Sequence, residues 1–194
     1  TSYFTTKQKE VLYTESFGSK QLPNTNDLIA KTFNQSGSSH KTEQAVYTDF
    51  TTYLPDDLLT KVDIATMAVS LEGRSPFLDH ELLELTAKIP FSLKLKGLNN
   101  KKYILKEALR GIIPDEVMFR PKMGFGVPID QWFRGELRDY MYQKLLSPKA
   151  LSRNLFRESA VRAILDEHCQ TTINHAPRIW ALLTLELWFE AYFD

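Results

Sequence analysis

The sequence predicts a mainly α-helical fold, and three observations support this prediction. Apolar residues recur at intervals of three and four along most of the chain, as on one face of a helix. Prolines stand where several of these segments begin, and a proline is well tolerated in the first helical turn. Only residues 91–95 alternate like a strand. With 43% hydrophobic and 25% charged residues in 194, the chain has a globular composition.

We expect one domain, residues 1–194, with a weakly patterned leading segment (1–42) and a helical core (43–194). Short helices are predicted at 7–13 and 27–33, and the Ser- and Gly-containing stretch 35–42 is typical of a loop. In the core, helices are predicted at 43–53, 55–72, 81–88, 101–110, 114–118, 136–146, 155–168 and 177–192. No internal repeat or linker divides this core.

Two of these helices carry patterns that predict their surroundings. The helix starting at Pro55 has a stripe expected to be buried, formed by Leu58, Val62, Ala65 and Val69. The final helix is apolar nearly all round, so we expect it to be buried on several sides or to cover a partner surface. Asp79 stands just before 81–88 and is expected to cap that helix.

Composition excludes several classes of function. Lys plus Arg and Asp plus Glu both number 24, so no basic footprint for nucleic acid is evident. No leader or membrane-spanning segment is expected, and the single cysteine, Cys169, permits no intrachain disulfide. His40, His80 and His168 show no metal-ligand spacing, so no metal site is predicted. A cytoplasmic protein that binds neither membrane nor nucleic acid is the expectation.

Two blocks of sequence resemble the asparagine synthetase family. In the first, Asp63 and Met67 are followed by Glu72-Gly73-Arg74 and then by Pro-Phe-Leu-Asp at 76–79. In the second, Lys-Lys-Tyr-Ile-Leu-Lys at 101–106 is followed by Arg-Pro-Lys-Met-Gly-Phe-Gly-Val-Pro at 120–128 and by Trp-Phe at 132–133. The resemblance is firm over residues 53–137 and looser beyond them.

The resemblance implies that this chain is the helical C-terminal portion of an α/β ATP-pyrophosphatase (adenine nucleotide alpha hydrolase-like) synthetase domain. In such enzymes a carboxylate, here most simply that of aspartate, attacks the α-phosphate of ATP to give an acyl-adenylate and magnesium pyrophosphate. Ammonia derived from glutamine then takes the acyl group. ATP and Mg²⁺ are therefore the expected cofactors, and aspartate is the expected carboxylate substrate.

The resemblance and local chemistry together nominate the site residues. Lys122 is expected to stabilise negative charge on the phosphate and the intermediate, because a fixed cation does so well in a water-poor site. Gly124 belongs to the same glycine-rich stretch, where backbone can approach a ligand. Arg120 could bind substrate or nucleotide, or could equally pair with a nearby acid.

Glu72, Arg74 and Asp63 form the second set of candidates. Glu72 could act on the incoming amine as base or ammonium ligand while Arg74 positions a carboxylate or phosphate. The two could instead be an ion pair that braces the loop. Asp63, on a different helix face from the apolar stripe, could orient the substrate or the groups around it.

The family's pyrophosphate loop, Ser-Gly-Gly-x-Asp-Ser, and its acidic magnesium-binding segment do not occur in this sequence. We therefore expect the nucleotide-binding half and any glutaminase domain to lie upstream, and the present chain to be inactive alone. Two alternatives stay open. One is an amidotransferase of the same family acting on another carboxylate, such as a sugar acid. The other is a non-catalytic helical interaction module.

Overall fold

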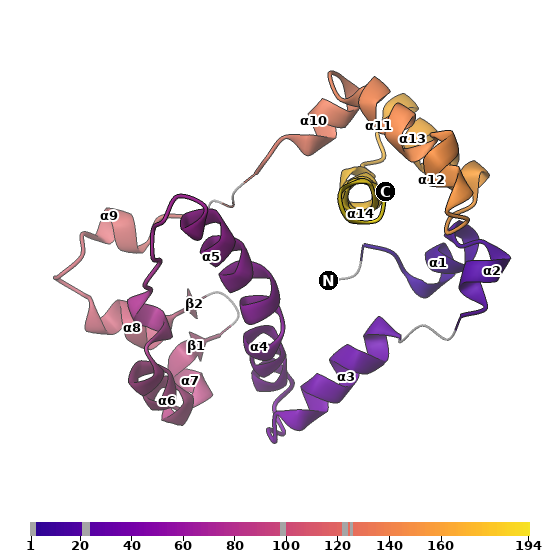
Figure 1. Ribbon diagram of the computed structural model, residues 1–194. Helices are drawn as coiled ribbons and strands as arrows, with labels where there is room; N and C mark the ends of the chain where they lie inside the picture. The colour runs from indigo at the N-terminus through magenta and orange to yellow at the C-terminus, as the bar shows by residue number, and fades with distance from the viewer. Residues whose placement is uncertain (1–2, 21–23, 98–99, 122–123, 125) are drawn as a thin grey trace. The chain divides into compact units, whose positions relative to one another are not determined.

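The computed structural model describes residues 3–20, 24–97, 100–121, 124 and 126–194 (Figure 1). It is mainly helical, as predicted, with a single two-stranded sheet among the described residues. The chain divides into two compact units. We call residues 1–25 and 124–194 the terminal unit and residues 26–123 the middle unit; each is described by itself. The expectation of a single domain stays a prediction.

The terminal unit joins the two ends of the chain. Its helices are α1 (Thr6–Leu12), α2 (Glu15–Gly18), α10 (Ile129–Arg134), α11 (Arg138–Leu145), α12 (Pro148–Ser152), α13 (Glu158–Gln170) and α14 (Ala176–Tyr192). Backbone bonds tie the N-terminal helices to the segment before α13, because Arg157 N–H donates to the Leu12 carbonyl at 2.8 Å and Thr14 N–H to the Leu155 carbonyl at 3.1 Å.

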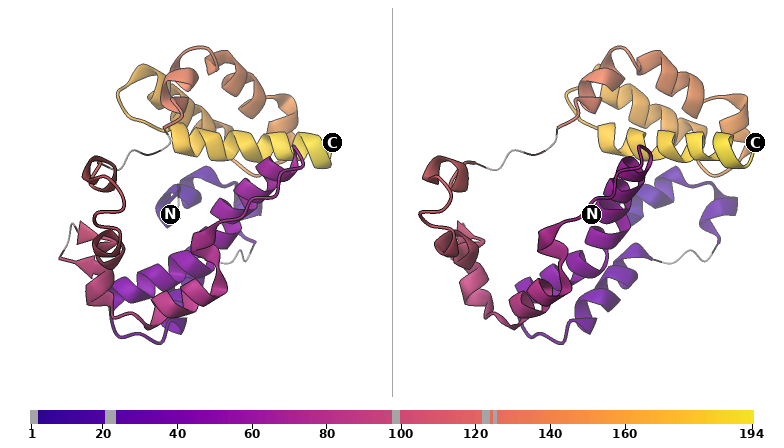
Figure 2. Two further views of the ribbon diagram at one scale, coloured as in Figure 1. Left: turned by 90° about the vertical axis from the view of Figure 1, so that its left-hand side faces the viewer. Right: turned by 60° about the vertical axis from the view of Figure 1, so that its left-hand side comes forward.

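The hydrophobic core lies in the terminal unit, where α11, α13 and α14 pack side by side (Figure 2). Its buried members share an inward position on these helices and on α1 and α10: Leu12, Phe133, Met141, Leu145, Val161, Leu165, Ala176, Ile179, Leu182 and Leu183. The final helix, α14, is buried on one side only. Trp180, Trp188 and Tyr192 on it remain exposed.

The middle unit is a succession of shorter elements. They are α3 (Thr25–Gln35), α4 (Lys41–Thr51), the π-helical η1 (Leu54–Leu59), α5 (Thr60–Met67), the 3-10 helix η2 (Pro76–Leu78), α6 (His80–Lys88), α7 (Phe91–Lys94), β1 (Leu95–Lys96), β2 (Asn100–Lys101), α8 (Tyr103–Ala108) and α9 (Asp115–Met118). The two strands pair antiparallel, with Leu95 opposite Lys101 and Lys96 opposite Asn100.

The predicted strand at 91–95 is wrong for most of its length. Phe91–Lys94 forms the helix α7, which starts directly after Pro90, and the Leu93 N–H donates to the Pro90 carbonyl at 3.0 Å. Three alternating apolar residues fit one helical turn as well as a short strand, so local hydrogen bonding after the proline decides the outcome. Strand structure begins only at Leu95.

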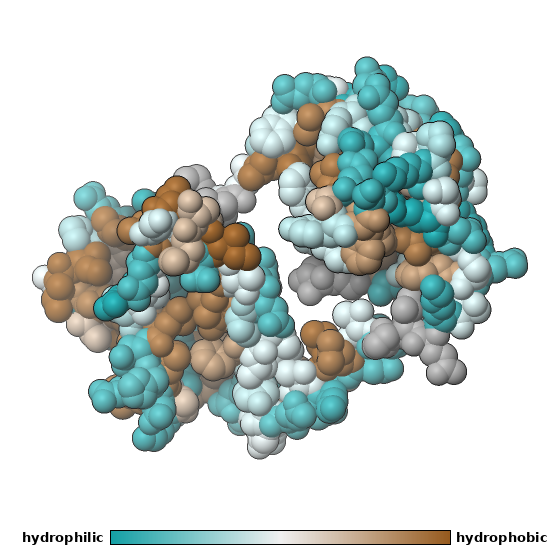
Figure 3. All heavy atoms as spheres, viewed as in Figure 1, coloured by the Kyte–Doolittle hydropathy of each residue, from teal (hydrophilic) through white to brown (hydrophobic). Residues whose placement is uncertain are grey.

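Hydrophobic side chains of the middle unit stay largely at its surface. All ten buried hydrophobic residues among those described belong to the terminal unit. Figure 3 shows brown, hydrophobic residues gathered on the visible face of the middle unit. The predicted buried stripe at 58–69 is therefore incorrect for this chain: Leu58, on η1, is half-buried, but Val62 and Ala65, on α5, and Val69, just after it, are exposed.

Most predicted helices are present with shifted ends. The predicted loop at 35–42 shrinks to residues 36–40, between α3 and α4. The helix expected at 55–72 is divided into η1 and α5 and ends at Met67. α10 and α12 were not predicted, since each is only five or six residues long. No helix in the described parts of the chain is long and apolar enough to cross a membrane.

Candidate functional site

The end of α5 sets the position of the Glu72-Gly73-Arg74 motif. Ser70 has a left-handed backbone, with φ at 58°. Its N–H donates to the Met67 carbonyl at 3.0 Å, and the Leu71 N–H donates to the Thr66 carbonyl at 3.0 Å. These two bonds form a Schellman motif, which normally uses glycine, and a serine in this conformation costs on the order of 1 kcal/mol. The chain leaves the helix in a fixed direction at this point.

Gly73 then brings the motif back against α5. A Cβ atom at Gly73 would lie 3.7 Å from both the Val62 Cγ1 and the Thr66 Oγ1 atoms. Asp63 stands one turn before Thr66, and its carbonyl accepts a bond from the Thr66 hydroxyl at 3.2 Å. The structure therefore places Gly73 of the motif against the turn of α5 that also contains the exposed Asp63.

Glu72 and Arg74 form a two-pronged ion pair. Arg74 Nε donates to Glu72 Oε1 at 2.9 Å, and Arg74 Nη2 donates to Glu72 Oε2 at 3.0 Å. An ion pair between these two residues was one of the two interpretations of the sequence. The pair is not buried, because the side chains of Arg74 and Glu72 are 82% and 68% exposed. An exposed pair contributes little stability, and both groups remain accessible to a ligand.

The residues of the second motif are only partly placed. Arg120 is exposed and, among the described residues, makes no hydrogen bond or ion pair. Gly124 is exposed too, and a Cβ atom there would meet no described atom within 4 Å, so packing within the described chain does not require glycine. Lys122 lies outside the described residues. The structure thus pairs Glu72 with Arg74, next to the helix that carries Asp63.

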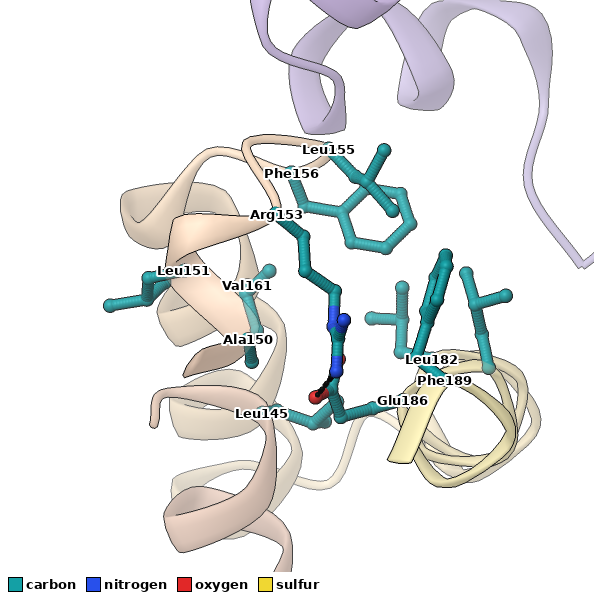
Figure 4. A pocket seen from close by; sticks show the side chains of 11 residues that line it. Leu145, Ala150, Leu151, Arg153, Leu155, Phe156, Val161, Leu182, Glu186 and Phe189 are labelled. Carbon is teal, nitrogen blue, oxygen red and sulfur yellow. Dashed lines mark hydrogen bonds and ion pairs between the residues drawn. The ribbon is translucent and has the colours of Figure 1, made fainter. Parts of the chain in front are cut away.

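Two cavities lie away from these motifs. The first, in the terminal unit, has a volume of about 20 Å³ and lies beside Arg153, whose guanidinium bonds both oxygens of Glu186 at 2.9 and 3.0 Å (Figure 4). It has room for about one water molecule. The second, about 760 Å³, is an open groove of the middle unit between α4 and the helices α6 and α7. None of the predicted site residues lines either cavity.

A polar cluster around His168 was missed at the sequence level. His168 is fully buried, and its Nδ1 accepts the His175 N–H at 3.1 Å, so the proton resides on Nε2. That Nε2 lies 3.7 Å from Asp130 Oδ1. Burial, and then the positive charge of Arg134, lower the pKa of His168. The i, i+4 spacing of Asp130 and Arg134 could have indicated an ion pair on one helix face here.

Asp79 caps α6, as predicted, and its Oδ1 accepts the Leu82 N–H at 3.1 Å. It is therefore a structural residue here. Among the residues the structure describes, no group of three His, Cys, Asp or Glu side chains could hold a metal ion.

Comparison with known proteins gives consistent results. A family model described as asparagine synthase matches residues 3–190. Asparagine synthetase (glutamine-hydrolyzing) 1 of Bacillus subtilis is 33% identical over 171 residues, covering 84% of this chain and 25% of that protein. A putative asparagine synthetase of Mycobacterium bovis is 36% identical over 169 residues, covering 87% and 26%. The asparagine synthetase of Gallus gallus is 31% identical over 154 residues, covering 72% and 26%.

The chain thus spans about a quarter of the length of these curated relatives. No solved structure matches it significantly.

Proposed function

Because this chain belongs to the asparagine synthase family, we propose that it is the helical C-terminal part of the ATP-dependent synthetase domain of a glutamine-hydrolysing asparagine synthetase. The observation that carries the proposal is the family match over residues 3–190, nearly the whole chain. The two motif blocks lie within this range. In this proposal, the full-length synthetase acts in the cytoplasm and converts aspartate to asparagine.

The proposed reaction has two steps. The side-chain carboxylate of aspartate attacks the α-phosphate of ATP, which forms β-aspartyl-AMP and releases pyrophosphate. Ammonia from glutamine then attacks the activated carbonyl, and AMP leaves with the formation of the amide. Negative charge builds on the phosphate oxygens in the first step, so a fixed cation there lowers the barrier.

The residues of this chain take the following roles in the proposal. Lys122 faces the phosphate and the reaction intermediate, with Arg120 and the backbone at Gly124 beside the nucleotide. Arg74 orients a carboxylate or phosphate, since a guanidinium binds such groups through two parallel bonds. Glu72 accepts a proton from, or binds, the incoming amine, and Asp63 orients substrate. The exposure of Glu72 and Arg74 supports these roles, because a ligand can reach both groups.

Magnesium bound with the nucleotide would neutralise charge on its phosphates. The residues that would hold it lie, in the proposal, mainly upstream of this chain, as the family resemblance implies. The upstream part would also supply the pyrophosphate loop and the glutaminase domain.

The exposed apolar surface of the middle unit supports this arrangement. On and just after α5, Ile64, Met67 and Val69 are all more than half exposed. Large contiguous apolar patches on a protein surface are characteristic of contact surfaces. We propose that the nucleotide-binding half covers these residues in the full-length protein.

The test uses the full-length protein and follows aspartate-dependent exchange of pyrophosphate into ATP. Lys122→Ala should abolish this exchange while leaving the thermal unfolding midpoint unchanged. Lys88→Ala, which removes another lysine from the middle unit, is the matched control and should exchange normally. Normal exchange by Lys122→Ala would refute the assigned role. Exchange supported by another carboxylate but not by aspartate would establish the alternative amidotransferase.

A further inference from the structure

The second motif runs directly into α10, so whatever fixes α10 also fixes the end of the motif. The Ile129 N–H donates to the Val127 carbonyl at 2.8 Å, and the Trp132 N–H donates to the Pro128 carbonyl at 3.0 Å. The last two motif residues therefore supply the first acceptors of this helix. A shift or rotation of α10 moves residues 126–128 with it.

Arg134, on the last turn of α10, connects this helix to the end of α13. Its Nη1 donates to the carbonyls of His168 and Thr171, the latter at 2.6 Å, and its Nη2 donates to the Ile173 carbonyl at 3.0 Å. The last carbonyls of a helix lack partners within the helix and carry the negative end of its dipole. A guanidinium is well suited to this position, because its planar fork donates several bonds in fixed directions.

The Nε donor of Arg134 is used within α10. Arg134 Nε donates to Asp130 Oδ1 at 3.0 Å, one helical turn earlier. The same carboxylate oxygen faces His168 Nε2 at 3.7 Å. The Arg134 side chain is 26% exposed. It is thus a largely buried cation that bonds one carboxylate and three carbonyls at once.

We propose that Arg134 is a positioning residue for the proposed adenylation reaction: it fixes α10 against α13 and thereby holds the downstream end of the motif, residues 126–128, in its working position. This inference rests on the proposed function. Arg134 itself touches no reacting atom in the proposal.

A second arginine of the terminal unit separates positioning from simple stabilisation. Arg153 is 14% exposed and pairs with Glu186 and Asp194, at the far end of α14 from the Arg134 cluster. It is at least as buried as Arg134 and equally rich in ionic contacts. Arg153→Ala should therefore lower the unfolding midpoint at least as much as Arg134→Ala without moving α10.

The experiment compares full-length wild type, Arg134→Ala, Arg134→Lys and Arg153→Ala below the unfolding midpoints of all four proteins. Arg134→Ala should lower kcat for aspartate-dependent pyrophosphate exchange roughly ten- to a hundredfold, since a misplacement of about 1 Å can have that effect. The KM values for ATP and aspartate should change little. Arg134→Lys should be intermediate, because one ammonium group cannot span three carbonyls and a carboxylate. Equal kcat values for Arg134→Ala and Arg153→Ala would overturn the proposal.

Hydrogen exchange of the peptide covering residues 126–134 gives a readout that does not depend on activity. Arg134→Ala should speed amide exchange in this peptide, whereas Arg153→Ala should leave it at the wild-type rate. Should Arg134→Ala fail to fold, Asp130→Asn takes its place, since it weakens the same cluster from the other side. If amide hydrogen exchange in this peptide is the same in the folded variant as in wild type, the inference is overturned. If the wild-type protein shows no aspartate-dependent pyrophosphate exchange, while the variants show the expected changes in hydrogen exchange, only the proposed function is overturned.

Discussion

Phe133 is the side chain on which the packing of α10 depends most. It is 0% exposed, and its ring meets the His168 ring at 6.4 Å and the Trp180 ring at 6.5 Å between centroids. Full burial of a phenylalanine stabilises by about 1.5–3 kcal/mol, and the cavity left by truncation adds to the loss, so Phe133→Ala should cost about 3–5 kcal/mol. The terminal unit should lose a large part of its stability.

Phe193→Ala is the matched control. Phe193 is the same residue type in the same unit, but it is 67% exposed and contacts only exposed or half-buried aromatic rings. Its truncation should cost about 1 kcal/mol or less. All three tryptophans of the chain, Trp132, Trp180 and Trp188, lie in the terminal unit, so their fluorescence during urea unfolding reports on this unit. Equal losses for Phe133→Ala and Phe193→Ala would refute the packing described for α10.

Two further predictions concern one residue in each unit. Because the pKa of His168 lies below its ordinary value of 6.5 in the folded chain, the unfolded chain binds more protons as pH falls below 6.5. The free energy of unfolding of the terminal unit should then decrease, by at most about 1.4 kcal/mol per pH unit until the folded-state pKa is passed. His168→Gln should remove this dependence from the tryptophan-detected unfolding curve, and an unchanged slope would show that other groups cause it. In the middle unit, Asp79→Ala should cost about 1 kcal/mol through loss of the α6 cap. Asp79→Asn should cost much less, and hydrogen exchange of the first-turn amides of α6 checks both; equal protection in the two variants would contradict the capping bond.

The sequence predicts the helices well where amphipathic patterns are long. Three of the four ends of α13 and α14 lie within two residues of the predicted bounds; the exception is the start of α13, at Glu158 instead of 155. The agreement is good because buried positions repeat over several turns of each helix. Phe91–Lys94 and α12 are too short for periodicity to identify them. The first follows Pro90, and the second has Pro148 in its first turn and Ser147 as its cap. Here local capping decides the structure.

Burial was predicted less well than helicity. Val62, Ala65 and Val69 were expected to form one buried stripe, yet all three are exposed in this chain. A hydrophobic pattern indicates that a surface is to be covered, but it does not identify what covers it. The same holds for α14, whose pattern predicted either burial on several sides or a partner surface. Its aromatic residues Trp180, Trp188 and Tyr192 are exposed in this chain.

The candidate site residues were predicted from the resemblance of the two motifs, and the structure shows direct contacts for only some of them. The Glu72–Arg74 pair forms as one interpretation expected, and Asp63 lies on the adjoining helix. The roles of these groups and of Lys122 stay predictions. Arg134 was not found from the sequence, because its partners at 168, 171 and 173 are distant carbonyls that no sequence pattern marks.

The proposed activation of aspartate, in which the full-length protein joins its carboxylate to AMP, can be followed with aspartate labelled with ¹⁸O in the side-chain carboxylate. The labelled aspartate is supplied together with ATP and glutamine, and the products are analysed by mass spectrometry. We expect one ¹⁸O atom in AMP for each asparagine formed, since the bridging oxygen of β-aspartyl-AMP leaves with the nucleotide. Asparagine formed with unlabelled AMP, or with ADP and phosphate as products, would rule out the β-aspartyl-AMP intermediate.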